Sequence, residues 1–504
     1  MIYLDGNSLA LDGLIAIAHE FAPAAIAPDA RERVRAARAV VDDFADRDAP
    51  AYGINTGFGS FADVKIPHDS LSQLQINLLR SHAAGVGEPL PIAVVRATIA
   101  LRANVLAKVF SGIRLETLDL LVALLNRRVH PVVPSRGSVG ASGDLAPLAH
   151  LALVLIGEGE AWDGSAREPG AQALARAGLT PVTLAPKEGL ALINGTQPSA
   201  ALLGLAVAGA ERLARAADIA AALSIDGLQG STKPFDARIH RARGFAGQAA
   251  SAANLGALLA NSGINAAHAN CGRVQDAYSM RCAPQVHGTM RETCRFAREV
   301  FQIEANAATD NPMVFADTHE IVSGGNFHGA PVAAAADVLC IGLAQLATIS
   351  ERRADRLVNP ALSGLPAFLT PHGGLHSGLM MAQVTAAALA SELKTLAHPA
   401  SVDTIPTSGN KEDHVSMSMA AALKAARAVE LARHVIAVEL LCACQAIDLL
   451  KPLETSPMLS RVHAAIRAHV PELVDDRPPS RDISTISELI ARGELERACA
   501  MIVN

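Results

Sequence analysis

Residues 137–144 have the sequence GSVGASGD, and this segment contains residue types that could take part in a chemical reaction. Three glycines in seven residues give the backbone unusual freedom, directly before an apolar segment, Leu145 to Ile156, that is typical of a helix. The simplest interpretation is a loop that ends in a helix N-cap, with Ser142 or Asp144 as the capping side chain.

Two well-known catalytic loops do not match this stretch. A hydrolase nucleophile elbow needs G-x-S-x-G, and neither Ser138 nor Ser142 has glycine at both of the required positions. The phosphate-binding patterns G-x-x-x-x-G-K-[ST] and G-x-G-x-x-G do not occur in the loop either.

A third chemistry treats Ala141, Ser142 and Gly143 as one reacting unit. Attack of the Gly143 amide nitrogen on the Ala141 carbonyl carbon closes a five-membered ring. Loss of two waters, one of them from the Ser142 hydroxyl, then leaves 4-methylidene-imidazol-5-one (MIO), an electrophile made from the chain itself. The residue types suit the reaction, because glycine is an unhindered nucleophile that can bend back, and alanine keeps the carbonyl side small.

The elements that hold this loop are predicted to be helices. The chain of 504 residues is 50% hydrophobic but only 3% aromatic and is rich in alanine, which favours helices over a β-sandwich or barrel. The hydrophobic content excludes a disordered chain. A net charge of −6 does not indicate the basic surface that nucleic-acid binding requires. Four long segments should pack as a bundle: Ser199 to Leu223, Ala333 to Leu357, Gly378 to Leu396 and Val415 to Leu450.

The predicted fold class is therefore mainly all-α, in three parts. Residues 1–198 form a mixed, loop-rich N-terminal region with short helices such as Arg31 to Phe44 and Pro91 to Phe110. Residues 199–450 form the central long-helix bundle. Residues 451–504 form a C-terminal helical tail, with a last helix from Ile483 to Met501.

The cysteines and the N-terminus indicate a cytoplasmic protein. Seven cysteines are an odd number, and none of them forms a C-x-x-C pair, which is typical of reduced thiols. The start of the chain has no basic region before an apolar one, and runs such as Ser199 to Ala210 end at a charge before about 18 residues. The surplus of apolar helix surface favours an oligomer.

The segment ASGDLAPLAH, residues 141–150, closely resembles the MIO site of the aromatic amino acid ammonia-lyases. Further segments resemble the same family in order along most of the chain. They are a tyrosine loop at 52–59, an asparagine segment at 187–196, the motif QDAYSMRC at 275–282, TDNP at 309–312 and GGNFHG at 324–329.

The resemblance implies roles for two tyrosines and an arginine. Tyr52 would take the β-proton of the substrate, on a glycine-rich loop that could close over the site. Tyr278 would lie beside the MIO group, and Arg281, three residues later on the same side of a helix, would bind the substrate carboxylate. The alternatives are a Tyr52 packed on the core with its hydroxyl in water, and an Arg281 in a surface salt bridge.

Four further positions complete the implied site. Asn194 would hold the substrate carboxylate or the MIO oxygen, and otherwise is a turn residue before Gly195. Gln275 and Asn311 would supply polar contacts. Phe327 would form an apolar wall, unless it is an ordinary core residue.

The choice of substrate depends on two positions. Ser81 and His82, and the segment NKEDHVSM at 410–417, look like the histidine-specific members of the family. His82 and Glu412 can satisfy the two nitrogens of an imidazole ring in a desolvated pocket. The implied reaction converts L-histidine to trans-urocanate and ammonia, the first step of histidine degradation, with the electrophile attacking either the amine or the ring. The alternatives are a phenylalanine or tyrosine ammonia-lyase, a 2,3-aminomutase, or an inactive helical scaffold.

The resemblance also implies a homotetramer with shared sites, no nucleic acid or membrane partner, and no metal or nucleotide. His372 and His376 have the i, i+4 spacing of metal ligands, but the paired glycines between them oppose a helix and no third ligand is evident. The chain departs from the pattern of histidine-specific members at four positions: Lys411 replaces a common Gln, Ala277 a Pro, Gly272 an acidic residue, and His287 a Met.

Overall fold

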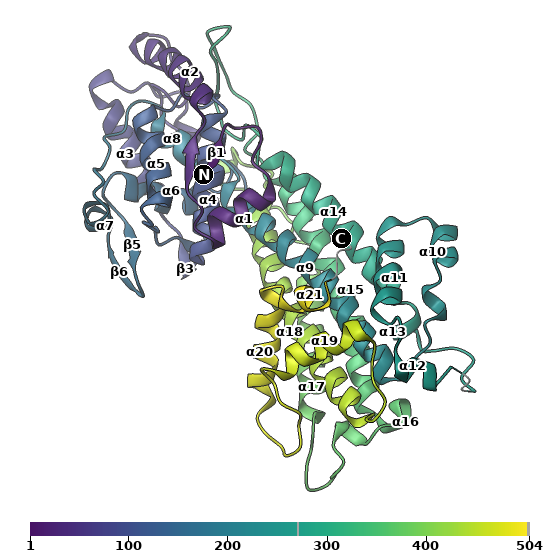
Figure 1. The fold of residues 1–504 in the computed structure, drawn as a ribbon. Coiled ribbons are helices and arrows are strands. Elements are labelled where there is room, and N and C mark those ends of the chain that lie inside the picture. The colour runs from purple at the N-terminus through teal and green to yellow at the C-terminus, as the bar shows by residue number, and fades with distance from the viewer. Residues whose placement is uncertain (270–271, 501–504) are drawn as a thin grey trace. The chain divides into compact units, whose positions relative to one another are not determined.

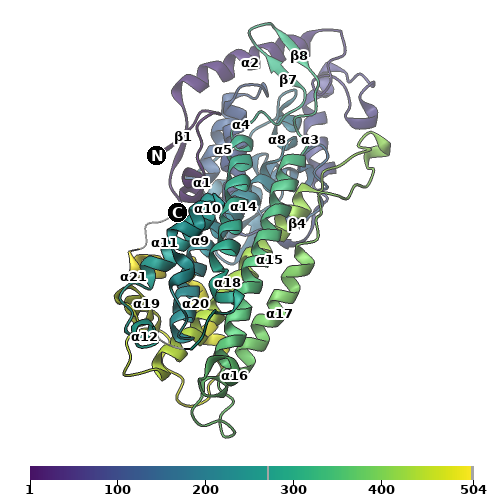
Figure 2. The same ribbon diagram turned by 90° about the vertical axis from the view of Figure 1, so that its right-hand side faces the viewer.

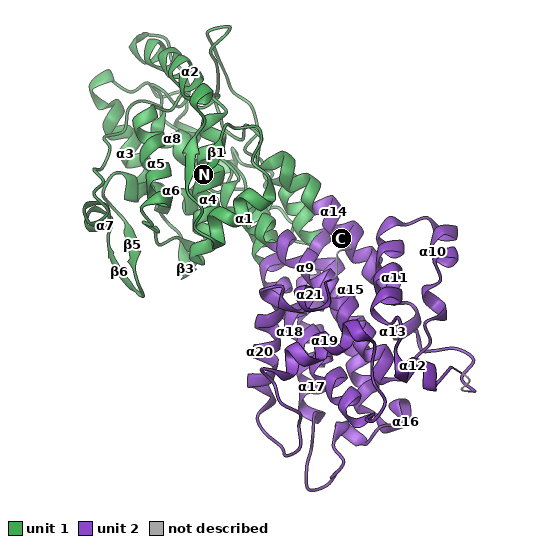
Figure 3. Cartoon of the chain, viewed as in Figure 1, with its two compact units in different colours: residues 1–205, 298–337, 399–423 green, residues 206–297, 338–398, 424–504 purple. Residues whose placement is uncertain are grey.

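The computed structural model describes residues 1–269 and 272–500 and is mainly helical, which confirms the predicted all-α class (Figure 1). The chain divides into two compact units, each assembled from three stretches of sequence (Figure 3). Unit 1 contains residues 1–205, 298–337 and 399–423, and unit 2 contains residues 206–297, 338–398 and 424–504. The three-part division at residues 198 and 450 stays a prediction.

Unit 1 combines short helices with four small strand pairs. Its helices are α1 (Leu11–His19), α2 (Pro28–Asp46), α3 (Leu71–His82), α4 (Ile92–Ala107), α5 (Leu115–Asn126), α6 (Leu145–Leu155), α7 (Gly170–Arg176) and α8 (Glu188–Ile193). Strands β1 (Ile2–Leu4) and β2 (Ala24–Ile26) pair in parallel. The antiparallel pairs are β3 (Val86–Pro89) with β4 (Pro134–Arg136), β5 (Glu160–Asp163) with β6 (Ala166–Pro169), and β7 (Met313–Phe315) with β8 (Glu320–Val322).

The core of unit 1 surrounds helix α4, in which every residue from Val94 to Ala107 is buried. Helices α1 and α5 pack against α4. Helices α3, α6 and α8 contact one another, and each adjoins a segment that the sequence singles out. α3 ends at His82, α6 follows residues 137–144, and α8 ends immediately before Asn194. Packing of these three helices therefore fixes three parts of the predicted site against each other.

Unit 2 is built on long helices that run roughly along a common direction (Figure 2). They are α9 (Gln197–Gly227), α14 (Ala283–Glu304), α15 (Ala330–Val358), α17 (Met380–Leu396) and α18 (Ser418–Leu449), of which all but α17 begin or end in unit 1. Shorter helices complete the unit: α10 (Ala237–Arg243), α11 (Ala246–Leu258), α12 (Gly263–Ala267), α13 (Tyr278–Arg281), α16 (Pro360–Ser363), α19 (Pro457–Arg467), α20 (Pro479–Ala491) and α21 (Glu494–Cys499).

The predicted long helices are confirmed within a few residues at each end. The predicted last helix is instead two helices, α20 and α21, with Gly493 between them at φ 67°. A glycine in this left-handed conformation ends the first helix and redirects the chain. No disulfide bond links the six cysteines that the structure describes.

Helix α15 is long and apolar enough, by length and composition, to cross a membrane, and no other described helix meets both criteria. In this fold, however, 61% of its apolar window is buried against other parts of the protein. Burial of this extent is typical of a core helix rather than a lipid-facing one.

Candidate active site

The loop at residues 137–144 is held by a buried carboxylate. Asp144 accepts a hydrogen bond from Ser138 Oγ at 2.6 Å through one oxygen and from the Ser199 backbone N–H at 2.8 Å through the other. Asp144 is the N-cap residue of α6, which was one of the two predicted alternatives, but its side chain makes no capping bond to that helix. The carboxylate contacts the first turn of α9 instead. Complete burial raises the pKa of Asp144, and the hydrogen bonds from Ser138 and Ser199 oppose this rise.

Gly143 lies directly against the backbone of Gly195. A β-carbon at Gly143 would lie 2.3 Å from the Gly195 carbonyl oxygen, and the residue adopts φ 76°. The Asp144 N–H donates to that same carbonyl at 2.7 Å. Sterics and backbone conformation thus both require glycine at position 143.

Asn194 reaches the reacting unit from the other side. Its Nδ2 donates to the Ser142 carbonyl oxygen at 3.2 Å, and its buried Oδ1 has no hydrogen-bond partner among the described residues. Arg102, fully buried in α4, holds the segment by donating to the Asn194 carbonyl at 2.8 Å and to the Ala191 carbonyl at 2.5 Å. Burial lowers the pKa of Arg102 to about 10, so the guanidinium still carries its charge at neutral pH.

Glu412 contacts the hydroxyl of Ser142. Ser142 Oγ donates to Glu412 Oε1 at 2.6 Å, and Thr407 Oγ1 donates to Glu412 Oε2 at 2.5 Å. Thr407 and Glu412 also pair through their backbones, with Thr407 N donating to Glu412 O at 3.0 Å. Both carboxylate oxygens are therefore oriented by hydroxyl donors.

Tyr52 and His82 both lie close enough to Glu412 to respond to its charge. Burial raises the pKa of the Tyr52 phenol, the Glu412 carboxylate adds to the rise, and a hydrogen bond with the Gly59 backbone opposes it. Burial lowers the pKa of His82, although a hydrogen bond to the Leu78 carbonyl and the Glu412 charge oppose the change. His82 is thus a neutral imidazole at pH 7, with Nδ1 2.9 Å from the Leu78 carbonyl oxygen.

Asn311 and Phe327 lie in the remaining loops of unit 1. Asn311 Oδ1 accepts a hydrogen bond from Gly324 N at 2.8 Å. This bond links the two family-like segments at 309–312 and 324–329. Phe327 is half-buried and therefore not a plain core residue. The next residue, His328, stacks on His414 with ring centroids 5.8 Å apart and planes 6° from parallel.

Gln275, Tyr278 and Arg281 belong to unit 2. Tyr278 is 70% exposed and Gln275 is exposed. The Arg281 guanidinium carbon lies 4.7 Å from the centre of the Tyr278 ring, as the predicted spacing on one helix side requires. Arg281 therefore contacts an aromatic ring, and it forms no ion pair with any described carboxylate. Tyr278 also lines a largely apolar groove of about 700 Å³ in this unit.

The four departures from the family pattern have different surroundings. Lys411 and Gly272 are exposed, and Ala277 is the residue that precedes α13. His287 is fully buried, and its Nδ1 lies 2.8 Å from the Asp218 carboxylate. Burial lowers the pKa of His287, and the Asp218 carboxylate opposes the change.

Sequence reasoning missed Thr407 and Arg102, which orient Glu412 and Asn194. Arg102 had a usable signal, since an arginine inside an apolar helix must find a buried acceptor. Thr407 lies five residues from Glu412 in an irregular segment, and no periodic pattern marks it.

The surroundings of Ala141, Ser142 and Gly143 fit the MIO group. Gly195 leaves room only for a glycine at 143, and the Ser142 carbonyl, which the ring would retain, already accepts from Asn194. Across residues 1–269 and 272–500, no three His, Cys, Asp or Glu side chains gather as metal ligands would.

Comparison with known proteins agrees with this geometry. The family model described as aromatic amino acid lyase matches residues 9–468. The histidine ammonia-lyase of Anaeromyxobacter sp. (strain K) is 58% identical over 504 residues, covering 98% of this chain and 99% of that protein.

Two solved structures extend the comparison to three dimensions. The histidine ammonia-lyase of Trypanosoma cruzi is similar with a TM-score of 0.92 and 45% identity, covering 99% of this chain and 95% of that chain. The tyrosine aminomutase of Streptomyces globisporus gives a TM-score of 0.95 and 37% identity, covering 100% of both chains.

A mainly helical enzyme with a glycine-cradled Ala-Ser-Gly unit is the class that the fold and site define. The chain belongs to the aromatic amino acid lyase family.

Proposed function

We propose that this enzyme is a histidine ammonia-lyase, which converts L-histidine to trans-urocanate and ammonia. The observation that carries the proposal is the placement of Glu412, which contacts Ser142 Oγ at 2.6 Å and acts electrostatically on His82. A carboxylate in contact with the reacting unit, together with an imidazole close enough to respond to its charge, suits a substrate ring with one N–H donor and one acceptor nitrogen. The similarity to histidine ammonia-lyases at 58% and 45% identity supports the same substrate.

The proposed cofactor is MIO, formed from Ala141, Ser142 and Gly143. Once formed, it supplies the electrophile that activates the substrate, at the amine or at the ring. Asn194 Nδ2 holds the Ser142 carbonyl oxygen and so fixes the orientation of the reacting unit.

Tyr52 is the proposed base for the β-proton. Its phenol must lose a proton to act, and burial together with the Glu412 charge opposes that loss. Turnover should therefore increase as the pH rises above neutral.

Gln275, Asn311 and Phe327 are proposed contacts of the substrate, and Arg281 is proposed to bind its carboxylate. Tyr278 is proposed to act beside the MIO group. Substrate contacts of these kinds need only the polar, cationic or aromatic side chains that these positions supply.

A homotetramer with shared sites is the proposed assembly. A tyrosine that is 70% exposed on a largely apolar groove supports burial of this surface by another copy of the chain. The proposed location is the cytoplasm, where thiols such as Cys442 and Cys444 stay reduced. Burial raises the pKa of both, to about 12 for Cys444, which makes them inert.

A substrate panel tests the activity. The purified protein is incubated with L-histidine, L-phenylalanine or L-tyrosine, and the absorbance of the unsaturated product is followed. Urocanate from histidine alone is the expected result. Cinnamate or coumarate as the main product would assign a phenylalanine or tyrosine lyase, and a β-amino acid would assign an aminomutase.

A further inference from the structure

The contact between Ser142 and Glu412 bears on cofactor formation as well as on substrate recognition. Ser142 is the residue that must lose its hydroxyl when the proposed MIO group forms. Ring formation starts from the encoded residues Ala141, Ser142 and Gly143, so the groups within reach of Ser142 Oγ bear on how its hydroxyl can leave. The hydroxyl donates to Glu412 Oε1 at 2.6 Å. Hydroxide is a poor leaving group, and its departure needs a proton donor within hydrogen-bond reach.

We infer that Glu412 acts earlier than turnover, as the general acid that removes the Ser142 hydroxyl as water when the cofactor forms. The inference rests on the proposed MIO chemistry and assigns its dehydration step to a named residue. Glu412 thereby has a role in the maturation of the enzyme that is separate from any contact with substrate.

The step balances with solvent water as the only other participant. Glu412, a carboxylate when it accepts the hydrogen bond from Ser142, takes a proton from solvent and then donates it to Oγ, while the Cβ–Oγ bond of Ser142 breaks and a water molecule leaves. The electrons of the Cα–H bond form the Cα=Cβ double bond, and the Cα proton passes to a solvent water. The proton released from Cα balances the one that Glu412 took from solvent, so Glu412 ends as the carboxylate and the net change is loss of one H₂O from Ser142.

The geometry holds Glu412 at this position independently of Ser142. Thr407 Oγ1 donates to the second carboxylate oxygen, Oε2, at 2.5 Å, which leaves Oε1 to face the serine. The segment after Glu412 is fixed to the loop at two further points, where Ser416 Oγ donates to Gly140 O and Met417 N donates to Val139 O, each at 2.8 Å. Thr407 is therefore a positioning residue for Glu412.

The nearest alternative acid is turned away from the reacting hydroxyl. Asp144 is only two residues from Ser142, and burial raises its pKa. Its two oxygens accept from Ser138 Oγ and from Ser199 N, however, so neither faces Ser142.

Intact-mass spectrometry of the full chain tests the inference without measuring turnover. Wild-type chains should be about 36 Da lighter than the sequence, the mass of two waters. In Glu412→Gln, the fraction of such chains should fall at least tenfold, with unmodified chains or chains lighter by about 18 Da in their place. Glu32→Gln, at an exposed position of α2, is the matched control and should match the wild type.

Thr407 provides a second pair of variants. Thr407→Val should slow the mass loss, followed after dilution from denaturant, and Thr407→Ser should restore it because the hydroxyl returns. This pair decides the question if circular dichroism shows that Glu412→Gln does not fold. Complete mass loss in a folded Glu412→Gln, or equal rates in Thr407→Val and Thr407→Ser, would overturn the inference. Absence of the mass loss in the wild type would instead refute the proposed cofactor.

Discussion

Lys187 and Asp310 form a buried ion pair in unit 1, with Nζ 3.1 Å from Oδ2 and at most 1% of either side chain exposed. Lys187 precedes α8, which leads to Asn194, and Asp310 precedes Asn311. Lys187 Nζ also donates to the Ser111 carbonyl at 2.9 Å. One ammonium group thus joins two site segments that are 123 residues apart in sequence.

Replacement of Tyr52 by phenylalanine tests the proposed base. Tyr52→Phe removes the phenol that is proposed to accept the β-proton, so kcat should fall by about 100-fold or more, as for loss of a general base. The measurement is urocanate formation from L-histidine. Tyr3→Phe is the control, because Tyr3 is exposed in β1 and should tolerate the change. Retained turnover in Tyr52→Phe would remove Tyr52 from the reaction.

Replacement of His82 by leucine tests substrate selection. The pocket would lose the imidazole that is neutral at pH 7 and would leave a substrate nitrogen unpaired, which costs about 1–3 kcal/mol. The expected kcat/KM for L-histidine is therefore about 10- to 100-fold lower, with a smaller loss or a gain for L-phenylalanine. Equal losses for both substrates would show that His82 has a structural role only.

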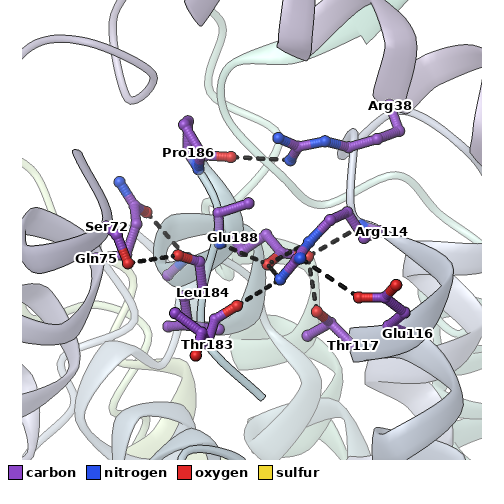
Figure 4. Close-up of polar contacts among 12 residues, drawn as sticks. Arg38, Ser72, Gln75, Arg114, Glu116, Thr117, Thr183, Leu184, Pro186 and Glu188 are labelled. Atoms are coloured by element: carbon purple, nitrogen blue, oxygen red, sulfur yellow. Dashed lines mark hydrogen bonds and ion pairs between the residues drawn. The ribbon is translucent and has the colours of Figure 1, made fainter. Parts of the chain in front are cut away.

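The buried carboxylate of Glu188 provides a stability test (Figure 4). It accepts hydrogen bonds from Arg114 N, Nε and Nη2, from Thr117 Oγ1 and from Ala185 N, at 2.6 to 3.0 Å. Glu188→Gln removes the charge and leaves the guanidinium poorly paired, which should cost about 3 kcal/mol of folding free energy. Thermal unfolding should show a lower midpoint.

Glu116→Gln is the matched control for that test. Glu116 also pairs with Arg114, at 3.4 Å, but its side chain is 76% exposed. Exposed pairs contribute little, so its unfolding midpoint should stay close to that of the wild type. A similar decrease of the unfolding midpoint in both variants would show that burial of Glu188 does not increase the contribution of its ion pair to stability.

The lowered pKa of His130 should make the stability of the protein depend on pH. Burial, with the positive charges of Arg96 and Arg128, lowers the pKa of His130 from 6.5 to about 4. The unfolded chain therefore binds a proton below pH 6.5 that the folded chain does not bind until about pH 4. Stability should fall as the pH drops through this range, by at most about 1.4 kcal/mol per pH unit.

A His130→Phe variant checks this dependence. Unfolding midpoints of the wild type and the variant are compared at intervals from pH 7 to pH 4. The variant should show a flatter curve, since phenylalanine does not titrate. Parallel curves would exclude His130 as the source of the acid sensitivity.

The sequence predicted the helical class because alanine-rich segments of 19 to 36 residues leave few alternatives, and the family-like motifs indicated candidate site residues. It could not predict that Asp144 bonds to Ser199 rather than capping α6, because that choice depends on where α9 begins in space. Arg102 and Thr407 were missed for the same reason, since each acts through a contact that only the folded chain creates.

The contact between Ser142 and Glu412 joins residues that are 270 positions apart. During synthesis, the serine leaves the ribosome long before the glutamate has been translated. A nascent chain that ends before residue 412 therefore lacks the acid that we assign to dehydration, however well its N-terminal segment folds. Formation of the electrophile would then follow completion of the chain, so that the reactive group appears only after the segment that helps to enclose it.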